Sequence, residues 1–383
     1  MRTPEPQPVD PALTPQARGF FDRLHAVTGT AALFGQQDAL AYGRRWSRGH
    51  IGRSDVRDTV GAHPAVLGFD LGRIELDEVA NLDGVLFDDI VAWIQEGHAN
   101  GCLITLSWHS VNPLTRGGYG ENTAPNSVAA VLPHGSHHAE FLHWLDRVSS
   151  FNSRLVDSAG EAIPIVFRPF HEHSGSWFWW GIGDGDHPGS ASPDEFAELW
   201  RMTVRQLRDK RGQHNLLYAI SPDRSRLSLD RFVEQYLRGY PGDEWVDVLG
   251  IDNYFDTGRA DNPIRPEQHL ANFVATLEQV AALAQARGKL AAQTEVGNAG
   301  ELTGNPDDPW TGFLARAATS TALTRRILWY LVWRNAPVPT GGNSLGTPTP
   351  DEATANDFRQ LAQSSFIRFA DRLPTLYRRS PRA

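Results

Sequence analysis

The sequence predicts an α/β protein built as one (β/α)8 barrel, the TIM barrel, on the strength of three observations. Eight short apolar runs alternate with longer amphipathic stretches along the chain. The 383 residues suffice for one large domain, and no low-complexity linker divides the interior. No sequence repeat of about 20 to 50 residues occurs, which disfavours a solenoid or a propeller.

The apolar runs have the length and composition of buried parallel strands. They cover residues 31–37, 65–71, 102–109, 164–172, 215–221, 246–254, 289–297 and 326–335. Several are almost continuously apolar, as strands covered on both faces are. An open doubly wound sheet is the alternative, but it normally carries a glycine-rich phosphate loop after its first strand. The glycine cluster at 117–120 lies elsewhere, so we interpret it as an active-site loop.

The stretches between the runs carry helix signals. Residues 87–99 and 141–148 place apolar side chains at helical spacing. Ser192 is a predicted N-cap, with proline in the first turn and a glutamate that completes a capping box. A long helix over 266–287 should end at Gly288.

Composition excludes several classes of protein. The chain has 36 Lys and Arg against 45 Asp and Glu, a formal net charge of −9, with no basic run suited to nucleic acid. A single cysteine, Cys102, excludes an internal disulfide and a cysteine-based zinc site. No apolar run approaches the ~20 residues that span a bilayer, so membrane insertion is not expected. We expect a monomer with a proline-rich tail at 1–15, a catalytic domain at 16–376 and a basic tail at 377–383.

Two glutamates stand where a barrel of this kind carries its active site, at the C-terminal ends of strands. Glu172 and Glu295 follow the fourth and seventh apolar runs, nearly opposite each other around the ring. Facing carboxylates in an aromatic pocket suit glycosidic-bond hydrolysis, in which one protonates the leaving oxygen while the other attacks or activates water. The aromatic residues at 177–180 should raise the pKa of Glu172, which favours the acid role. Arg168 and Tyr254 could donate hydrogen bonds to Glu295 and keep it ionised.

A metal hydrolase is the weaker alternative. Four histidines lie close together in the sequence: His134, His137, His138 and His143. No carboxylate or thiol with suitable ligand spacing accompanies them, so we interpret them as a solvated loop and the start of a helix. The residues around Glu172 also lack the HExxH spacing of zinc proteases. No metal and no other cofactor is expected.

Two long motifs resemble those of glycoside hydrolase family 26, best known for endo-β-1,4-mannanases. The family's acid/base segment resembles FRPFHEHSGSWFWWG at 167–181, and its nucleophile segment resembles AAQTEVG at 291–297. Further blocks match in the same order: GFDL (68–71), LSWHSVNP (106–113), GIDNY (250–254) and WYLVWRNA (329–336). The resemblance covers nearly the whole chain. One departure is Gln36, where many relatives have histidine.

The resemblance implies a retaining endo-β-1,4-mannanase with Glu172 as general acid/base and Glu295 as nucleophile. The residues that it places around the sugar at the cleavage point are His109, His171, Trp177 and Tyr254. Asp252 would support or contact Tyr254, Trp333 would form a sugar platform, and Arg334 would contact the glycone side. Arg168 either orients one of the two glutamates or only forms an ion pair inside the barrel.

The implied substrate is a β-mannan polysaccharide, so we expect a secreted or cell-surface protein whose export signal lies outside this sequence. Related activities remain open, because the family also includes mixed-linkage glucanases, β-1,3-xylanases and exo-acting mannobiohydrolases. A non-catalytic carbohydrate-binding barrel is the alternative from another functional class. The presence of both carboxylates disfavours it.

Overall fold

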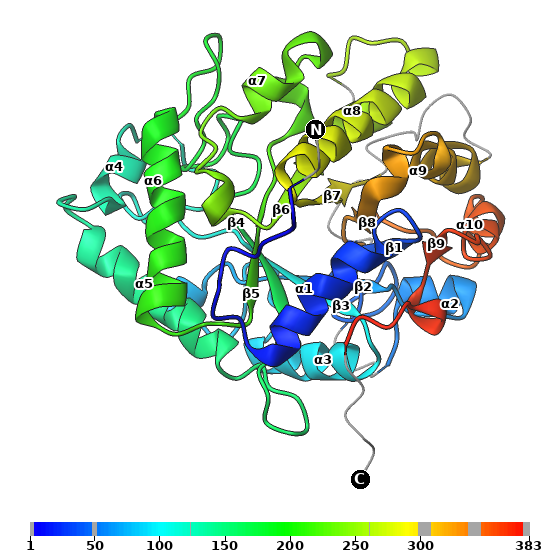
Figure 1. Ribbon diagram of the computed structural model, residues 1–383, viewed down its shortest axis with the longest axis horizontal. Coiled ribbons are helices and arrows are strands. Elements are labelled where there is room, and N and C mark those ends of the chain that lie inside the picture. The colour runs from blue at the N-terminus through cyan, green and yellow to red at the C-terminus, as the bar shows by residue number, and fades with distance from the viewer. Residues whose placement is uncertain are drawn as a thin grey trace.

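The computed structural model describes residues 4–47, 52–122, 124–259, 261–297, 308–335 and 346–377, and its centre is a closed barrel of parallel strands (Figure 1). The strands are β1 (Ala32–Gln37), β2 (Val66–Asp70), β3 (Leu103–Trp108), β4 (Ile165–Pro169), β5 (Leu216–Ile220), β6 (Val248–Asp252), β7 (Leu290–Val296) and β8 (Ile327–Val332). Each pairs with the next in sequence, and β1 pairs with both β8 and β2, which closes the ring. The predicted (β/α)8 barrel is therefore confirmed. A short ninth strand, β9 (Ile367–Arg368), pairs with the start of β1.

Helices surround the barrel. They are α1 (Pro15–Val27), α2 (Asp55–Val60), α3 (Phe87–Ala99), α4 (Ser127–Val131), α5 (His138–Asn152), α6 (Pro193–Val204), α7 (Phe232–Tyr236), α8 (Pro266–Arg287), α9 (Arg316–Thr319) and α10 (Ala355–Leu361). The limits of α3 and α8 match the prediction, and α8 ends at a left-handed Gly288. The predicted capping box at the start of α6 is present, with reciprocal bonds between Ser192 and Glu195.

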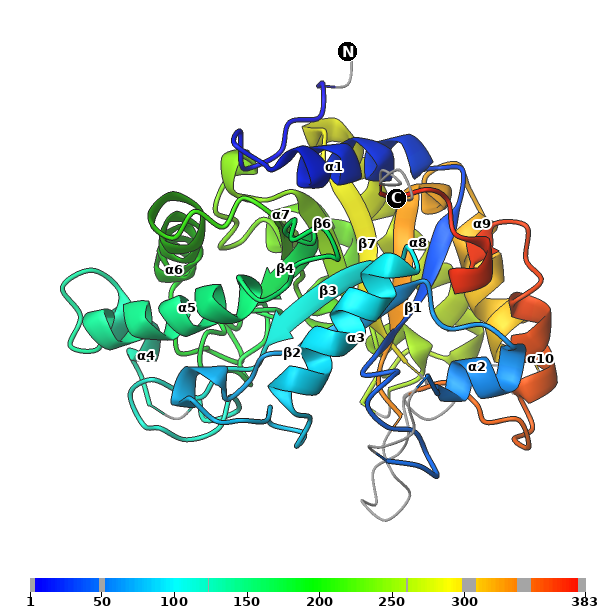
Figure 2. The same cartoon turned by 90° about the horizontal axis from the view of Figure 1, so that it is seen from below.

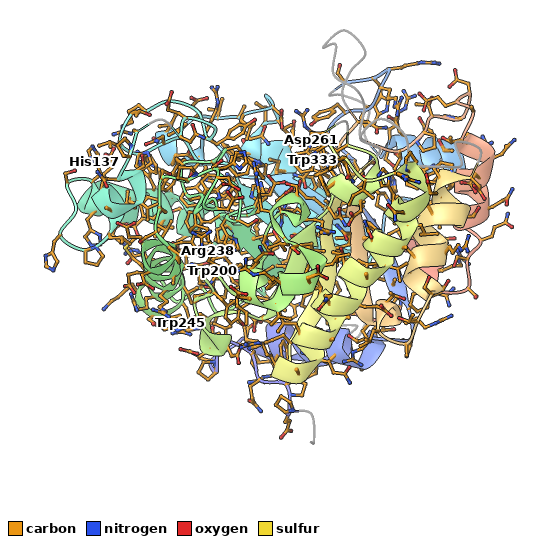
Figure 3. The ribbon with its side chains drawn as sticks, turned by 90° about the horizontal axis from the view of Figure 1, so that it is seen from above. His137, Trp200, Arg238, Trp245, Asp261 and Trp333 are labelled. Carbon is orange, nitrogen blue, oxygen red and sulfur yellow. The ribbon has the colours of Figure 1, made fainter. Side chains whose placement is uncertain are left out.

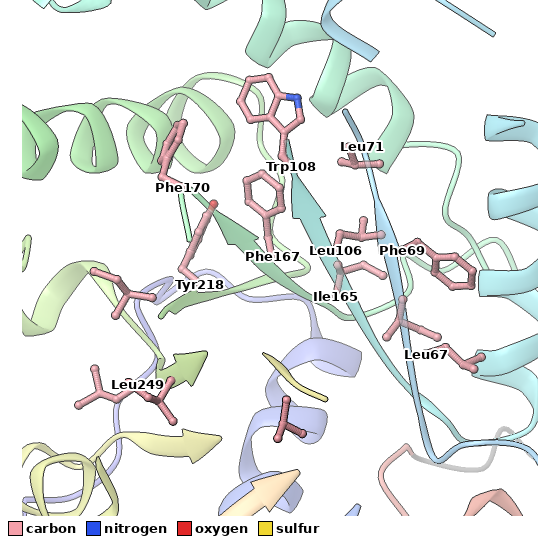
Figure 4. Close-up of a cluster of buried hydrophobic side chains, with 14 of the residues drawn as sticks. Leu67, Phe69, Leu71, Leu106, Trp108, Ile165, Phe167, Phe170, Tyr218 and Leu249 are labelled. Atoms are coloured by element: carbon pink, nitrogen blue, oxygen red, sulfur yellow. The ribbon is translucent and has the colours of Figure 1, made fainter. Parts of the chain in front are cut away.

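Side chains alternate between the inside of the barrel and the layer under the helices, because successive residues of a strand point to opposite faces. Outward residues of β2, β3 and β4 form the packed layer of Figure 4, which includes Phe69, Trp108 and Phe167. Inward residues at the start of the strands form a separate apolar cluster that includes Val66 and Val166. The core thus has one layer inside the barrel and one around it.

Helix α1 closes the N-terminal end of the barrel, which Figure 2 shows from the side. Its buried residues Phe20 and Leu24 belong to the same cluster as the inward side chains at the strand starts. The chain before α1 is packed as well: Val9 is buried, and its amide donates to Asp247 at 2.7 Å. Within the proline-rich stretch expected as a tail, Val9 therefore contacts the barrel.

Tyr377, the first residue of the predicted C-terminal tail, packs against the same end of the barrel. Tyr377 is buried, stacks on Phe20 with ring centroids 5.0 Å apart, and donates a hydrogen bond to the carbonyl of Cys102 at 2.9 Å. The basic residues expected beyond it lie outside the described residues. Across the described ranges, no helix is long and apolar enough to cross a membrane.

Candidate active site

Polar side chains gather inside the barrel at the C-terminal ends of the strands, the end opposite α1. On the inner face of β4, the apolar Val166 is followed by Arg168. The inner faces of β3 and β6 likewise end in polar residues, Ser107 and Asp252. Figure 3 shows Trp333 and Asp261 at this end, Trp245 towards the other end and His137 at the outer edge of the molecule. The inside of the barrel is therefore apolar at the starts of the strands and polar at their C-terminal ends. We call this polar end the mouth of the barrel.

A bulge in β7 brings Glu295 beside Asp252. The β6–β7 register pairs Ile251 with Gln293 but Asp252 with Glu295, so Thr294 is an extra residue on β7. The Thr294 hydroxyl then donates to Asp252 at 2.6 Å. A Cβ atom on Gly250 would lie 2.6 Å from the Thr294 methyl group, so the glycine makes room for the bulge. Bulges that re-aim a side chain are common next to active sites.

Glu295 is held by two donors, Arg168 and Tyr254, as anticipated. Arg168 donates to one carboxylate oxygen, and the Tyr254 hydroxyl donates to the other at 3.0 Å. Arg168 also donates to Asp252 at 2.9 Å and to Ser221 at 3.0 Å. Burial, followed by the nearby Glu295, raises the pKa of Tyr254 well above its usual value, so this phenol stays protonated and donates. Both oxygens of Glu295 are thus fixed in orientation.

Asp252 is bonded to residues of three strand ends. The resemblance implied support for Tyr254, but the bonds of Asp252 go to Arg168, Ser221 and Thr294. Arg168 thus bonds to Asp252 and to Glu295 and connects the two carboxylates. Burial raises the pKa of Asp252 well above its usual value, and Arg168 opposes this shift.

Glu172 stands across the mouth in a strained turn. Its φ angle is +53°, a left-handed conformation that is uncommon for a residue with a side chain. Its amide donates to the carbonyl of Ser221 at 2.7 Å, and its carboxylate accepts from Trp177 Nε1 at 2.6 Å. Burial raises the pKa of Glu172 well above its usual value, and so do nearby carboxylates. These carboxylates belong to Asp223, Glu295 and Asp252.

His109 and His171 form a buried chain that ends at Glu295. His109 Nδ1 lies 2.7 Å from Asp70, and its Nε2 lies 3.0 Å from Nε2 of His171. Burial disfavours the charged form of His109, but the Asp70 carboxylate outweighs it and raises the pKa. Burial and the neighbouring His109 lower the pKa of His171 far below its usual value. His171 Nε2 also lies 3.9 Å from an oxygen of Glu295, so the chain connects Asp70 to the second glutamate.

Trp333 and Arg334 line the rim after β8, where the sequence placed them. Trp333 is half-buried, and its ring lies edge-on to His109 with centroids 6.3 Å apart. Arg334 bonds to Tyr42 at 3.1 Å and to Asp83 at 3.0 Å. Trp333 thus keeps an accessible surface beside the mouth, while Arg334 is fixed by its neighbours.

Gln36 lies behind this rim. Its amide nitrogen lies 3.3 Å from Asn335 and 3.1 Å from Thr347, and the residue is buried. Gln36, where many relatives have histidine, therefore holds the residues that follow Trp333 in this chain.

One group of acidic side chains in the described ranges is close enough to hold a cation. A carboxylate oxygen from each of Glu172, Asp252 and Glu295 lies within 4.8 Å of the others. Arg168 already bonds to two of the three, so a fixed positive charge occupies this group. The histidines at 134–143 belong to no such group within the described part of the chain, and α5 begins among them, as anticipated.

Three residues of the site were assigned no role from the sequence. Asp70 ends β2 on the inner face, a signal that could have paired it with His109. Tyr119 comes from the glycine cluster at 117–120, and its ring centroid lies 4.7 Å from that of His109. Asp223, in the loop after β5, is 1% exposed and raises the pKa of Glu172. No sequence motif includes this residue. These partners depend on which strand ends are neighbours in space.

Comparison with known proteins agrees with this geometry. The family model described as glycosyl hydrolase family 26 matches residues 9–303. The chain belongs to glycosyl hydrolase family 26. The match includes both facing glutamates, so the resemblance found in the two sequence motifs is confirmed.

Two solved family 26 structures share the fold over most of the chain. A GH26 β-mannanase from Bacteroides ovatus has a TM-score of 0.84 and 35% identity, and covers 95% of this chain and 98% of that one. A modular endo-β-1,4-mannanase from Cellulomonas fimi has a TM-score of 0.83 and 34% identity, with 98% and 80% covered.

Curated relatives carry the name mannan endo-1,4-β-mannosidase. The one from Bifidobacterium adolescentis is 32% identical over 97% of this chain, and the one from Bacillus subtilis is 27% identical over 52%. This chain spans 36% of the length of the first relative, and the match covers 53% of the second.

Proposed function

We propose that this protein is a retaining endo-β-1,4-mannanase. The observation that carries the proposal is the short separation of the facing carboxylates: an oxygen of Glu172 and an oxygen of Glu295 lie within 4.8 Å. Retaining glycosidases hold their two carboxyl groups about 5 to 5.5 Å apart, whereas inverting enzymes leave about 6.5 to 9.5 Å for a water molecule. This gap suits direct attack on the sugar.

The environments of the two glutamates support different roles. The raised pKa of Glu172 keeps a proton available for the leaving oxygen, as a general acid requires. Glu295 accepts hydrogen bonds from Arg168 and Tyr254, which orient both oxygens and favour the ionised nucleophile. His171 lies close to Glu295 but is neutral, so it adds no charge that would compete with Arg168.

The mechanism is a double displacement. A Glu295 oxygen attacks the anomeric carbon, the glycosidic bond breaks, and the Glu172 proton passes to the departing oxygen. The product of this step is a glycosyl ester on Glu295. Glu172, now ionised, takes a proton from water, and the resulting attack on the anomeric carbon releases the sugar with its original configuration.

The substrate class rests on relatives. Both curated relatives described above are named as mannan endo-1,4-β-mannosidases, and both solved neighbours are described as mannanases. A β-mannan polysaccharide is therefore the proposed substrate. Because such a polymer does not enter cells, we place the protein outside the cell, acting as a monomer with its site built from one chain.

A panel of polysaccharides tests the proposal. We expect reducing-sugar release from β-1,4-mannan and glucomannan, with little from lichenan and β-1,3-xylan. Fast loss of viscosity at low sugar release would indicate cleavage within chains, and mannobiose as the first product would indicate an exo mode. Preference for lichenan or xylan would contradict the substrate, and no hydrolysis of any polysaccharide would favour a binding barrel.

Replacement of Trp333 by alanine should weaken catalysis without unfolding the protein. The half-buried ring offers an apolar face to a sugar, so kcat/KM on mannan should fall roughly tenfold, equivalent to about 1.4 kcal/mol. Trp329 provides a matched control, since it lies on β8, the strand that precedes Trp333, but is 0% exposed. Trp329→Ala should cost about 3 to 5 kcal/mol of folding stability. A comparable loss of thermal stability in Trp333→Ala would show that Trp333 is a core residue.

A further inference from the structure

We propose that Asp223 is a positioning residue that keeps Glu172 protonated, and that Arg259 limits this effect. The inference rests on the proposed function, because it concerns the acid role of Glu172. It assigns a task to the loop after β5, which carries none of the residues that the family motifs identify.

The backbone around Asp223 interlocks with the strained turn at Glu172. The Glu172 amide donates to Ser221 at 2.7 Å, one strand away. The Ser174 hydroxyl accepts from the Asp223 amide at 2.9 Å and donates to the Asp223 carbonyl at 3.1 Å. Residues 221–223 therefore run beside 172–174, and neither segment can shift without breaking these bonds.

The carboxylate of Asp223 is buried and lies among hydrogen-bond donors. The residue is 1% exposed, and one oxygen accepts from the amide of Ser225 at 2.8 Å and from the hydroxyl of the same serine. The other oxygen lies 3.8 Å from Nη1 of Arg259. Burial raises the pKa of Asp223, and Arg259, the Ser225 hydrogen bonds and Arg226 oppose this shift. The pKa of Glu172 is raised well above its usual value, so Glu172 is the acid that keeps its proton to higher pH.

Asp223 is also poorly neutralised compared with the other acids near Glu172. Asp252 and Glu295 both bond directly to Arg168. Arg259, by contrast, directs its bonds at 2.6 and 3.0 Å to Asp261 and only approaches Asp223. After burial, Asp223 is accordingly the strongest influence that raises the pKa of Glu172.

Other groups act on Glu172 from every side of the mouth. They are Arg168 on β4, Asp252, Tyr254 and Arg259 on and after β6, Glu295 on β7, and Tyr119 after β3. Of these, Arg259 carries a positive charge that opposes Asp223. Removal of Asp223 should therefore lower the pKa of Glu172, and removal of Arg259 should raise it.

Three variants test the proposal through the pH dependence of kcat/KM on mannan. In Asp223→Asn the alkaline limb should move to lower pH, with a severalfold loss at alkaline pH and a largely retained rate on the acidic side. In Arg259→Gln the same limb should move to higher pH. Asp230→Asn is the matched control, since it removes an exposed negative charge further along the same loop and should leave the limb in place.

A second readout separates this inference from the proposed function. The Glu172 carboxyl is titrated by 13C NMR in glutamate-labelled protein and assigned by the signal lost in Glu172→Gln. Its midpoint should fall in Asp223→Asn and rise in Arg259→Gln. An unchanged midpoint and limb in Asp223→Asn, or shifts of the same sign in both variants, would overturn the role of Asp223. If the wild-type protein hydrolyses no mannan and the two variants still show these midpoint shifts, the proposed function alone is overturned.

Discussion

Glu295→Ala should lower the hydrolysis of mannan by several orders of magnitude. No other described side chain is placed to form the glycosyl ester, because Asp252 is bonded to Arg168, Ser221 and Thr294. The measurement is kcat on mannan and on an aryl β-mannobioside with a good leaving group. Glu295→Gln is the matched control for folding, since it keeps the shape of the side chain and should be equally inactive.

Added azide should partly restore turnover of the aryl substrate by Glu295→Ala. The small anion can occupy the space left by the carboxylate and attack the anomeric carbon from the same side. One displacement then replaces two, so the product should be an α-mannosyl azide, the inverted configuration. A β-azide, or full activity without azide, would show that Glu295 is not the nucleophile.

The fold could be predicted from the sequence because strands and helices leave periodic signals. All eight apolar runs are barrel strands, and the limits of α3 and α8 follow from apolar spacing and from Gly288. The ends of the domain were harder to predict. Val9 and Tyr377 are single apolar residues in polar or proline-rich stretches, and only the assembled barrel gives them a surface to cover.

The sequence predicted those site residues that lie at the ends of strands. Strand-end position was enough to select Glu172 and Glu295, since the order of strands around the ring places them nearly opposite each other. The side-chain contacts between neighbouring strands could not be predicted in this way, because they depend on the register of the strands. The bulge at Thr294 shifts the β7 register by one residue, and this shift brings Glu295 beside Asp252. The position of Asp223 depends on tertiary contacts of a loop, and such contacts leave no periodic signal in a single sequence.

Glu172→Ala should reduce the hydrolysis of mannan strongly but spare substrates with good leaving groups. The sugar alkoxide released from mannan needs a proton as the bond breaks, whereas an activated aryl group departs without one. In the wild type, the rate should be bell-shaped in pH. Its alkaline limb should report loss of the Glu172 proton, and it should lie well above the ordinary range of a glutamate because burial raises the pKa of this group. In Glu172→Ala this limb should disappear from the profile of the aryl substrate.

The stereochemistry of azide products then separates the two glutamates. In Glu172→Ala, Glu295 still forms the glycosyl ester, and the base that would activate water is absent. Azide needs no base, so it should open the ester from the opposite side and yield a β-mannosyl azide. Trp177→Phe is a useful companion variant. It removes the Nε1 donor 2.6 Å from Glu172, a bond that lowers the pKa of that carboxyl, so its alkaline limb should move to higher pH. Equal losses on mannan and on the aryl substrate in Glu172→Ala would contradict the acid assignment, because only the acid role distinguishes the two leaving groups.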